Sequence, residues 1–271
     1  MKARLLALFL LSLALPASAA PSLAGGSPIV VGQSFELTSA VLGQTLKVNV
    51  WLPPGYADAG KRFPVLYLLD GAEDQDFQHI AGLAQVLELN GQYGEMIVVG
   101  ITDKDRQHDL TFPSSDPRDL KDAPTSGGSA AFRRYIASEL QPAIDATFRT
   151  NGRRVLIGES LAGLFTVETF LKQPDLFDGY IAISPSLWWD NGSLVKAAPD
   201  LLAAQPPGAR TLYLSVANEG PAMRVDALAA AIKAAPPKDL TFYFAPLPAE
   251  THATVYHPAA LDALRKLFPK A

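Results

Sequence analysis

The residues with the clearest capacity for chemistry form one short serine motif. It reads Gly158-Glu159-Ser160-Leu161-Ala162-Gly163. An apolar run precedes it and an apolar helical pattern follows, which is the setting in which a Gly-x-Ser-x-Gly turn projects a serine oxygen from the edge of a sheet. Ala162 stands where the strict motif has glycine, and Gly163 follows it. Because serine also favours helix N-caps, the motif alone leaves a purely structural Ser160 open.

A serine nucleophile needs a base, and the base needs a carboxylate to orient it. In folds with this turn the chain order is serine, acid, histidine, with the acid after a late strand and the histidine after the last one. Glu219 and His252 occur at those two places. Their rivals, Asp226 and His257, lie at the starts of helical patterns, where a helix dipole or a helix entry already accounts for them. We therefore predict Glu219 as the acid and His252 as the base.

Two backbone amides must point at the oxyanion that forms when a serine attacks an ester. One is the amide that follows the nucleophile, that of Leu161. The other should come from the loop after an early strand, which reads Leu69-Asp70-Gly71-Ala72. Gly71 permits a tight turn there, and we predict Ala72 as the donor. An ordinary Asp-Gly turn is the alternative interpretation.

Apolar patterning indicates the elements that position these residues. Residues 34–53 alternate as two strands around a Leu-Gly-Gln turn. Short apolar runs flanked by Gly, Pro or Asp are typical of parallel strands covered on both faces. Helical periodicity separates them. The apolar runs are 65–69, 96–101, 155–157, 180–183, 212–216 and 240–244, and the helical patterns are 130–148, 161–171, 225–235 and 259–268. We predict an α/β fold: a mainly parallel open sheet with helices on both faces and an antiparallel N-terminal hairpin.

One long polar segment interrupts this alternation. Residues 103–129 are rich in Asp, Pro and Ser and end in Thr-Ser-Gly-Gly. A connection of that length is uncommon unless it is functional, so we expect a functional loop or lid.

The overall composition limits the classes of function. The chain has 271 residues, 48% hydrophobic and 18% charged, which is typical of a folded globular protein. With 23 basic and 27 acidic residues there is no basic excess for a nucleic-acid partner. The absence of cysteine excludes disulfides, thiolate metal sites and thiol nucleophiles. We expect neither a metal nor an organic cofactor. His79 and His108, the remaining histidines, are expected at the surface or in supporting positions.

The first residues have the form of a secretory signal. Lys2 and Arg4 precede an apolar stretch too short to span a bilayer, and Ala17-Ser18-Ala19 supplies a small-x-small cleavage site. We predict a signal peptide over residues 1–19 and a single domain over residues 20–271. The expected protein is exported, most simply to the periplasm, without stable insertion in a membrane.

Taken together, these segments resemble the putative esterase family of α/β-hydrolases, which includes siderophore esterases, feruloyl esterases, esterase D and the antigen-85 acyltransferases. The similarity runs from about residue 35 onward, through the serine motif and the loop that contains His252. An Arg-x-x-Asp-Leu-Thr segment from Arg106 and a Ser-Leu-Trp-Trp-Asp segment through Trp188 and Trp189 are most similar to the siderophore-esterase branch. Glu159 replaces the histidine often found before the serine.

The resemblance implies an α/β-hydrolase fold, a triad of Ser160, Glu219 and His252, and an oxyanion hole from Ala72 and Leu161. It also implies that Arg106 and one or both of Trp188 and Trp189 lie near the substrate, a small-molecule ester or a ferric siderophore.

The residues leave alternatives open at each of these positions. Arg106 can bind an anionic substrate or pair with Asp105 or Asp109, and either tryptophan can stack on an aromatic acyl group or pack in the core. Acyl transfer and ligand binding without catalysis are the alternative functions on the same fold.

Overall fold

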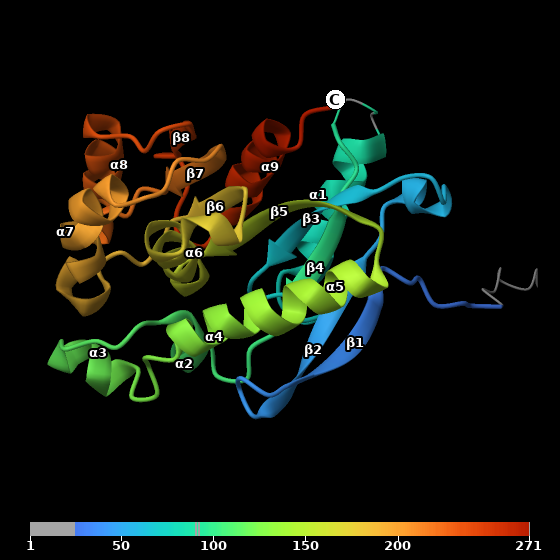
Figure 1. The fold of residues 1–271 in the computed structure, drawn as a ribbon, viewed down its shortest axis with the longest axis horizontal. Helices are drawn as coiled ribbons and strands as arrows, with labels where there is room; N and C mark the ends of the chain where they lie inside the picture. Colours follow the sequence, from blue (N-terminus) through green and yellow to red (C-terminus); the bar gives the residue numbers. More distant parts are fainter. Residues whose placement is uncertain (1–24, 90, 92, 271) are drawn as a thin grey trace, which may run out of the picture. The chain divides into compact units, whose positions relative to one another are not determined.

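Strands with apolar residues at nearly every position can be buried only in a sheet that is covered on both faces. The computed structural model, which describes residues 25–89, 91 and 93–270, has one such sheet within residues 31–271 (Figure 1). Its eight strands are β1 Gln33–Ser39, β2 Gln44–Trp51, β3 Phe63–Leu68, β4 Ile97–Ile101, β5 Thr150–Glu159, β6 Gly179–Ile183, β7 Arg210–Val216 and β8 Leu240–Pro246.

The strand order is β1-β2-β4-β3-β5-β6-β7-β8. The pairs β1–β2 and β2–β4 are antiparallel, and every pair from β4 to β8 is parallel. The mainly parallel sheet and the N-terminal hairpin are therefore as predicted. The connection that leaves β3 leads to β4 on one side, whereas the connection that leaves β5 leads to β6 on the other side. The strand order therefore switches between the neighbours β3 and β5. Ligand crevices of open α/β sheets form at the carboxyl ends of strands at such a switch point.

The helices alternate with the parallel strands. They are α1 Phe77–Leu89, α2 Arg106–Leu110, α3 Pro117–Asp122, α4 Ser129–Tyr135, α5 Gln141–Thr147, α6 Leu161–Lys172, α7 Trp189–Ala203, α8 Val225–Ala234 and α9 Tyr256–Leu267. A π-helical turn joins α4 to α5. The four predicted helical patterns match α4–α5, α6, α8 and α9. Helix α7 was not predicted because three left-handed residues, Asp190 to Gly192, and Pro199 interrupt its pattern.

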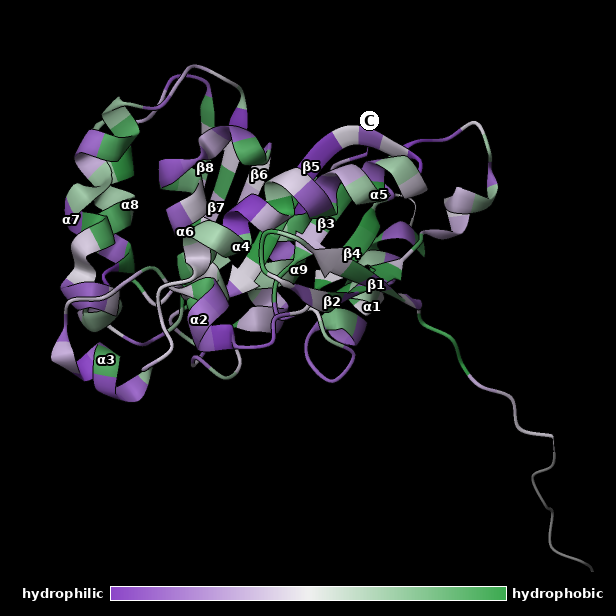
Figure 2. Cartoon of the chain, turned by 60° about the horizontal axis from the view of Figure 1, so that its bottom comes forward, coloured by the Kyte–Doolittle hydropathy of each residue, from purple (hydrophilic) through white to green (hydrophobic). Residues whose placement is uncertain are grey.

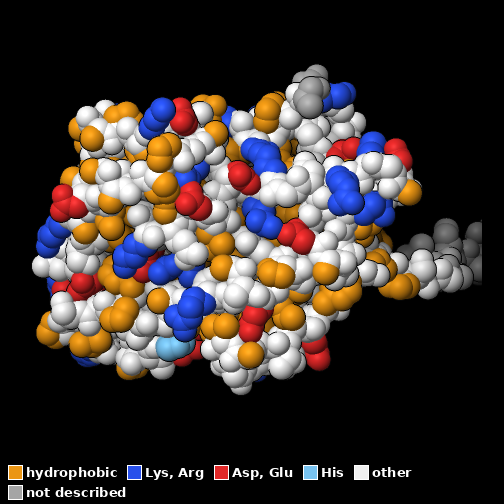
Figure 3. Space-filling view, in the orientation of Figure 1, with side chains coloured by type: hydrophobic (Ala, Val, Ile, Leu, Met, Phe, Trp, Pro, Cys, Tyr) orange, Lys and Arg blue, Asp and Glu red, His pale blue; other side chains and the backbone are white. Residues whose placement is uncertain are grey.

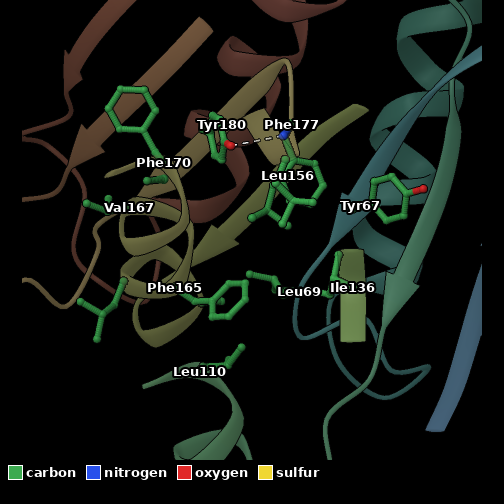
Figure 4. Packing of buried hydrophobic residues seen from close by; sticks show 14 of the residues in the cluster. Tyr67, Leu69, Leu110, Ile136, Leu156, Phe165, Val167, Phe170, Phe177 and Tyr180 are labelled. Atoms are coloured by element: carbon green, nitrogen blue, oxygen red, sulfur yellow. Dashed lines mark hydrogen bonds between the residues drawn. The ribbon is translucent and has the colours of Figure 1, made fainter. Parts of the chain in front are cut away.

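Alternate side chains of the central strands enter two separate cores. In β3, Val65 and Tyr67 join the core beneath α4 to α8, whereas Leu66 and Leu68 join the core beneath α1 and α9. Figure 4 shows part of the first core, in which the Phe177 amide donates to the Tyr180 hydroxyl at 3.2 Å. Hydrophobic colour concentrates on the strands in Figure 2. Helices thus cover both faces of the sheet, as predicted. The site residues lie at the ends of these buried strands.

The chain separates into the units Met1–Val30 and Val31–Ala271. The predicted signal peptide, residues 1–19, lies outside the described residues. Within the part of the chain that the structure describes, no helix is both long enough and apolar enough to cross a membrane.

Candidate active site

The candidate residues follow the carboxyl ends of four parallel strands in the sheet. Gly71 and Ala72 come after β3, Ser160 after β5, Glu219 after β7, and His252 after β8. The Leu69 amide donates to the Ile157 carbonyl at 3.1 Å, and the Asn218 amide to the Glu250 carbonyl at 2.9 Å. The first contact joins the loop after β3 to β5 and the second joins the loops after β7 and β8, so residues far apart in the sequence gather along one edge of the sheet.

Ser160 occupies a strained turn between β5 and α6. Its backbone lies at φ 59° and ψ −118°, a conformation that costs a non-glycine residue on the order of 1–3 kcal/mol. The turn is held by the Ser160 amide, which donates to the Ile183 carbonyl at 3.1 Å. Strain of this kind at a strand-to-helix junction is the geometry of a nucleophile elbow rather than of a plain N-cap, and the Ser160 side chain makes no capping bond.

Two glycines near Ser160 are each required by a different close contact. A Cβ on Gly158 would lie 2.6 Å from the Ala162 carbonyl carbon, so the strand and the helix touch at backbone distance. A Cβ on Gly163 would lie 3.0 Å from both the Ile183 carbonyl oxygen and the Pro185 Cα. The close approach to the next turn therefore falls on Gly163, which is why alanine is accommodated at position 162.

Glu219 and His252 meet at the ends of β7 and β8. The His252 Nδ1 and the Glu219 Oε1 form a short hydrogen bond, and the Glu219 side chain is 13% exposed. Asp226, the rival acid, is exposed in the first turn of α8. The rival base His257 instead contacts His79, with 3.0 Å between His257 Nδ1 and His79 Nε2. The structure thus brings the predicted acid and base together and places the rivals elsewhere.

The two predicted oxyanion donors lie on neighbouring loops. Leu161 is the first residue of α6, a position whose amide has no acceptor within its own helix. The Ala72 amide donates to the Gln75 Oε1 at 3.2 Å. The loop is anchored beneath by Asn49, whose Nδ2 donates to the Gly71 carbonyl at 2.9 Å. A substrate oxyanion at Ala72 would replace the side-chain oxygen of Gln75.

A cavity of about 260 Å³ opens beside Ser160. Its lining includes Leu161, Ser186 and three predicted substrate residues, Arg106, Trp188 and Trp189. Trp188 is 41% exposed. Trp189 is buried, and its Nε1 donates to the Phe112 carbonyl at 2.9 Å. Only Trp188 therefore has a face available to a ligand, while Trp189 packs in the core.

Arg106 has a different partner from the two expected. Its Nε and Nη2 donate to the two carboxylate oxygens of Asp70 at 2.7 and 2.8 Å. The alternative interpretation, a pair with Asp105 or Asp109, is therefore wrong: Asp105 instead caps α2 by accepting the His108 amide. Because Asp70 directly precedes Gly71, the guanidinium clamps the loop that contains Ala72.

Two carboxyl groups near the site, those of Glu159 and Asp103, have raised pKa values. Burial raises the pKa of Glu159 to about 7, and Asp76, Glu219 and Asp70 add to this while Arg106 opposes it. Burial, Asp70 and Asp109 raise the pKa of Asp103 to about 6, again against Arg106. Glu159 at the position before the nucleophile is therefore largely protonated at mildly acidic pH.

Two serines that sequence reasoning missed lie in the turn after β6. The Ser184 hydroxyl donates to the Glu219 Oε2 at 2.8 Å. The Ser186 Oγ is 3.3 Å from the Ser160 Oγ. The available signal was the position of Ser184-Pro185-Ser186 directly after an apolar strand run, at the same sheet edge as the predicted residues.

The polar segment 103–129 is folded onto this site. It contains α2 and α3, and Asp119 and Asp122 join Arg106 in lining the cavity. Asp190 at the start of α7 ties it down: its Oδ1 accepts the Ser115 amide at 2.8 Å, and its own amide donates to the Asp119 Oδ2 at 2.7 Å. The predicted functional loop thus forms a wall of the cavity.

Among the described residues, no group of three or more His, Asp or Glu side chains is arranged to hold a metal ion. On the face shown in Figure 3, basic and acidic side chains are interspersed.

Comparison with known proteins identifies the family and the fold. The chain matches the family model described as putative esterase over residues 39–262. It is 32% identical to an IroE-like serine hydrolase from Shewanella oneidensis, with a TM-score of 0.79 over 88% of this chain and 80% of that one. It is 29% identical over 154 residues to the ferri-bacillibactin esterase BesA of Bacillus subtilis, covering 49% of this chain and 51% of that protein. The match thus spans about half the length of that curated relative.

The fold extends to more distant proteins. The siderophore hydrolase EstA from Aspergillus nidulans superposes with a TM-score of 0.78 over 90% of this chain at 22% identity, a similarity of fold alone. The expected α/β-hydrolase fold is confirmed. The family match covers most of the chain, and its region contains every residue gathered at the strand ends described above. This chain belongs to the putative esterase family.

Proposed function

We propose that this protein is a serine esterase that cleaves carboxylic esters through an acyl-enzyme. The observation that carries the proposal is a serine in a strained strand-to-helix turn together with a hydrogen-bonded Glu219–His252 pair, all three following the carboxyl ends of strands in one parallel sheet. A hydroxyl nucleophile, an imidazole base and a carboxylate orienter in that chain order are the parts that acyl transfer requires.

In the proposed mechanism each group has one task. Glu219 accepts a hydrogen bond from the Nδ1–H of His252 and so keeps the Nε2 unprotonated as the base. His252 takes the Ser160 proton as the oxygen attacks the ester carbonyl. The Ala72 and Leu161 amides stabilise the oxyanion, and the alcohol leaves with the proton from His252. A water molecule, deprotonated by His252, then attacks the acyl-enzyme in the same way, and the acid leaves as Ser160 regains its proton.

We propose a siderophore ester of the catechol trilactone type as the substrate. Relatives are described as a ferri-bacillibactin esterase and a siderophore enterobactin esterase. The half-exposed Trp188 indole beside Ser160 suits stacking on an aromatic acyl ring. At about 260 Å³, the cavity is smaller than sites that enclose a drug-sized ligand, so it would hold one arm of a larger ester.

A paired assay tests the proposal. Wild type and Ser160→Ala are compared on a short p-nitrophenyl ester and on a catechol-siderophore lactone. We expect the variant to lose on the order of a thousandfold or more in kcat, because the residual rate comes from binding and the oxyanion donors. An acceptor alcohol in the mixture separates hydrolysis from acyl transfer. A variant as active as wild type would overturn the assignment of Ser160.

We also propose that residues 1–19 direct export to the periplasm and are removed. The form of the segment supports this, with its basic start, apolar stretch and small-residue cleavage site. The intact mass of the protein recovered from a periplasmic extract tests it: a mature chain that begins at Ala20 is expected, and a full-length chain would contradict the proposal.

A further inference from the structure

The turn after β6 lies between the strands that end in the nucleophile and the acid. Ile183 pairs with Glu159 of β5 on one side and with Ser215 of β7 on the other. The next residue, Ser184, is fully buried and donates its amide to the Ser215 carbonyl at 3.0 Å. The turn that contains Ser184 therefore contacts Glu219 through Ser184 and Ser160 through Ser186.

The Ser184 hydroxyl is held in a single hydrogen-bonding arrangement. The Ala217 amide donates to its oxygen at 3.1 Å, so the single hydroxyl proton is directed to the Glu219 Oε2 at 2.8 Å. The same amide also reaches that carboxylate oxygen at 3.2 Å. Glu219 thus has one oxygen fixed by two donors and the other, Oε1, in contact with His252.

The Ser184 backbone adopts a left-handed conformation in this arrangement. Its φ is 37°, a region in which glycine is favoured and a side chain is strained. Serine at a position that suits glycine indicates that the hydroxyl has a task there. Glutamate also has one more rotatable bond than aspartate, so it needs an additional restraint to present one oxygen steadily to an imidazole.

We propose that Ser184 is a positioning residue for the reaction: its hydroxyl fixes the Glu219 carboxylate so that Oε1 stays on the His252 Nδ1. The inference rests on the proposed esterase function and deepens it. Ser184 acts through Glu219 and does not touch the substrate.

Two replacements separate this role from a structural one. Ser184→Gly removes the hydroxyl and relieves the backbone strain, whereas Ser184→Ala removes the hydroxyl and keeps the strain. We expect kcat on a p-nitrophenyl ester to fall about 10- to 100-fold in both, as for other groups that orient a functional side chain, with KM unchanged. The glycine variant should melt at a higher temperature than the alanine variant. Activity that instead tracks the melting temperature, with glycine near wild type, would overturn the proposal.

Ser215→Ala is the matched control. Ser215 is equally buried on the neighbouring strand, and its hydroxyl contacts no polar partner among the described residues. We expect this variant to keep wild-type kcat, and a loss equal to that of Ser184→Ala would show a general response of the sheet edge.

A double-mutant cycle with Glu219→Ala gives the sharpest readout. If Ser184 acts only through Glu219, Ser184→Gly should cause no further loss in the Glu219→Ala background. A full additional loss in that background would overturn the proposed route. Failure of the esterase proposal is distinguishable, because Ser160→Ala would then retain activity, whereas failure of this inference leaves Ser160→Ala inactive and Ser184→Gly fully active.

Discussion

Replacing Arg106 by alanine should loosen the loop that contains Ala72. The guanidinium makes two charge-assisted hydrogen bonds to Asp70, whose side chain is 10% exposed, while the arginine itself is 35% exposed. Each such bond to a buried charge contributes about 1.5–3 kcal/mol, and partial exposure of the arginine reduces the total. We expect Arg106→Ala to lower the free energy of unfolding by about 2 kcal/mol.

The same replacement should also change the pKa values of two nearby carboxyl groups. Arg106 lowers the pKa of both Asp103 and Glu159, so its removal should raise both values further. A double-mutant cycle of Arg106→Ala and Asp70→Asn, measured by urea unfolding at neutral pH, isolates the pair. We expect a coupling free energy of about 1–2 kcal/mol.

Kinetics of the same variants test the positioning role of the pair. Because Asp70 leads into the loop of the proposed oxyanion donor, Arg106→Ala should lower kcat rather than merely raise KM. Coupling below about 0.5 kcal/mol would refute the stability argument, since that is the scatter for independent sites. A rise in KM alone would refute the loop argument and assign Arg106 to substrate binding.

Three further replacements test other parts of the site. Between the ordinary Glu pKa of 4.5 and the raised value of about 7, folded Glu159 holds a proton that the unfolded chain releases, so stability should fall as pH rises through that window. Glu159→Gln should remove this dependence of the unfolding free energy on pH, measured by urea unfolding. Wild type and variant with the same pH dependence would contradict the argument. Trp188→Ala should raise KM for aryl esters more than for acetyl esters, whereas Trp189→Ala should chiefly lower the melting temperature; the reverse pattern would exchange their roles. Gly163→Ala should cost about 1–3 kcal/mol of stability because its Cβ meets the Pro185 turn, and an unchanged denaturation midpoint would argue against that contact.

Much of the fold was accessible from sequence because it rests on local patterns. The apolar runs of the parallel strands and the four-residue spacing of helices α4–α5 reflect burial, which period and length reveal. Ser160, Glu219 and His252 were predicted because each lies in the segment after such a run, and chain order restricts their roles.

The remaining features depend on tertiary contacts that no local pattern encodes. Arg106 was expected to bind an anionic substrate or to pair with Asp105 or Asp109, yet its partner is Asp70, which lies 36 residues earlier in the chain. The part played by Ser184 follows from a left-handed backbone and from β6 lying between β5 and β7. Sequence reasoning also left Trp188 and Trp189 equivalent, and only burial separates them.

The most direct test of the central claim is covalent labelling of the nucleophile. An organophosphonate that mimics the tetrahedral intermediate is incubated with wild type, Ser160→Ala and Glu219→Ala, and intact-mass and peptide mass spectrometry locate the adduct. The account predicts one adduct per chain in wild type, on Ser160, slower labelling in Glu219→Ala, and none in Ser160→Ala. An unlabelled wild type, or an adduct on any other residue, would contradict it.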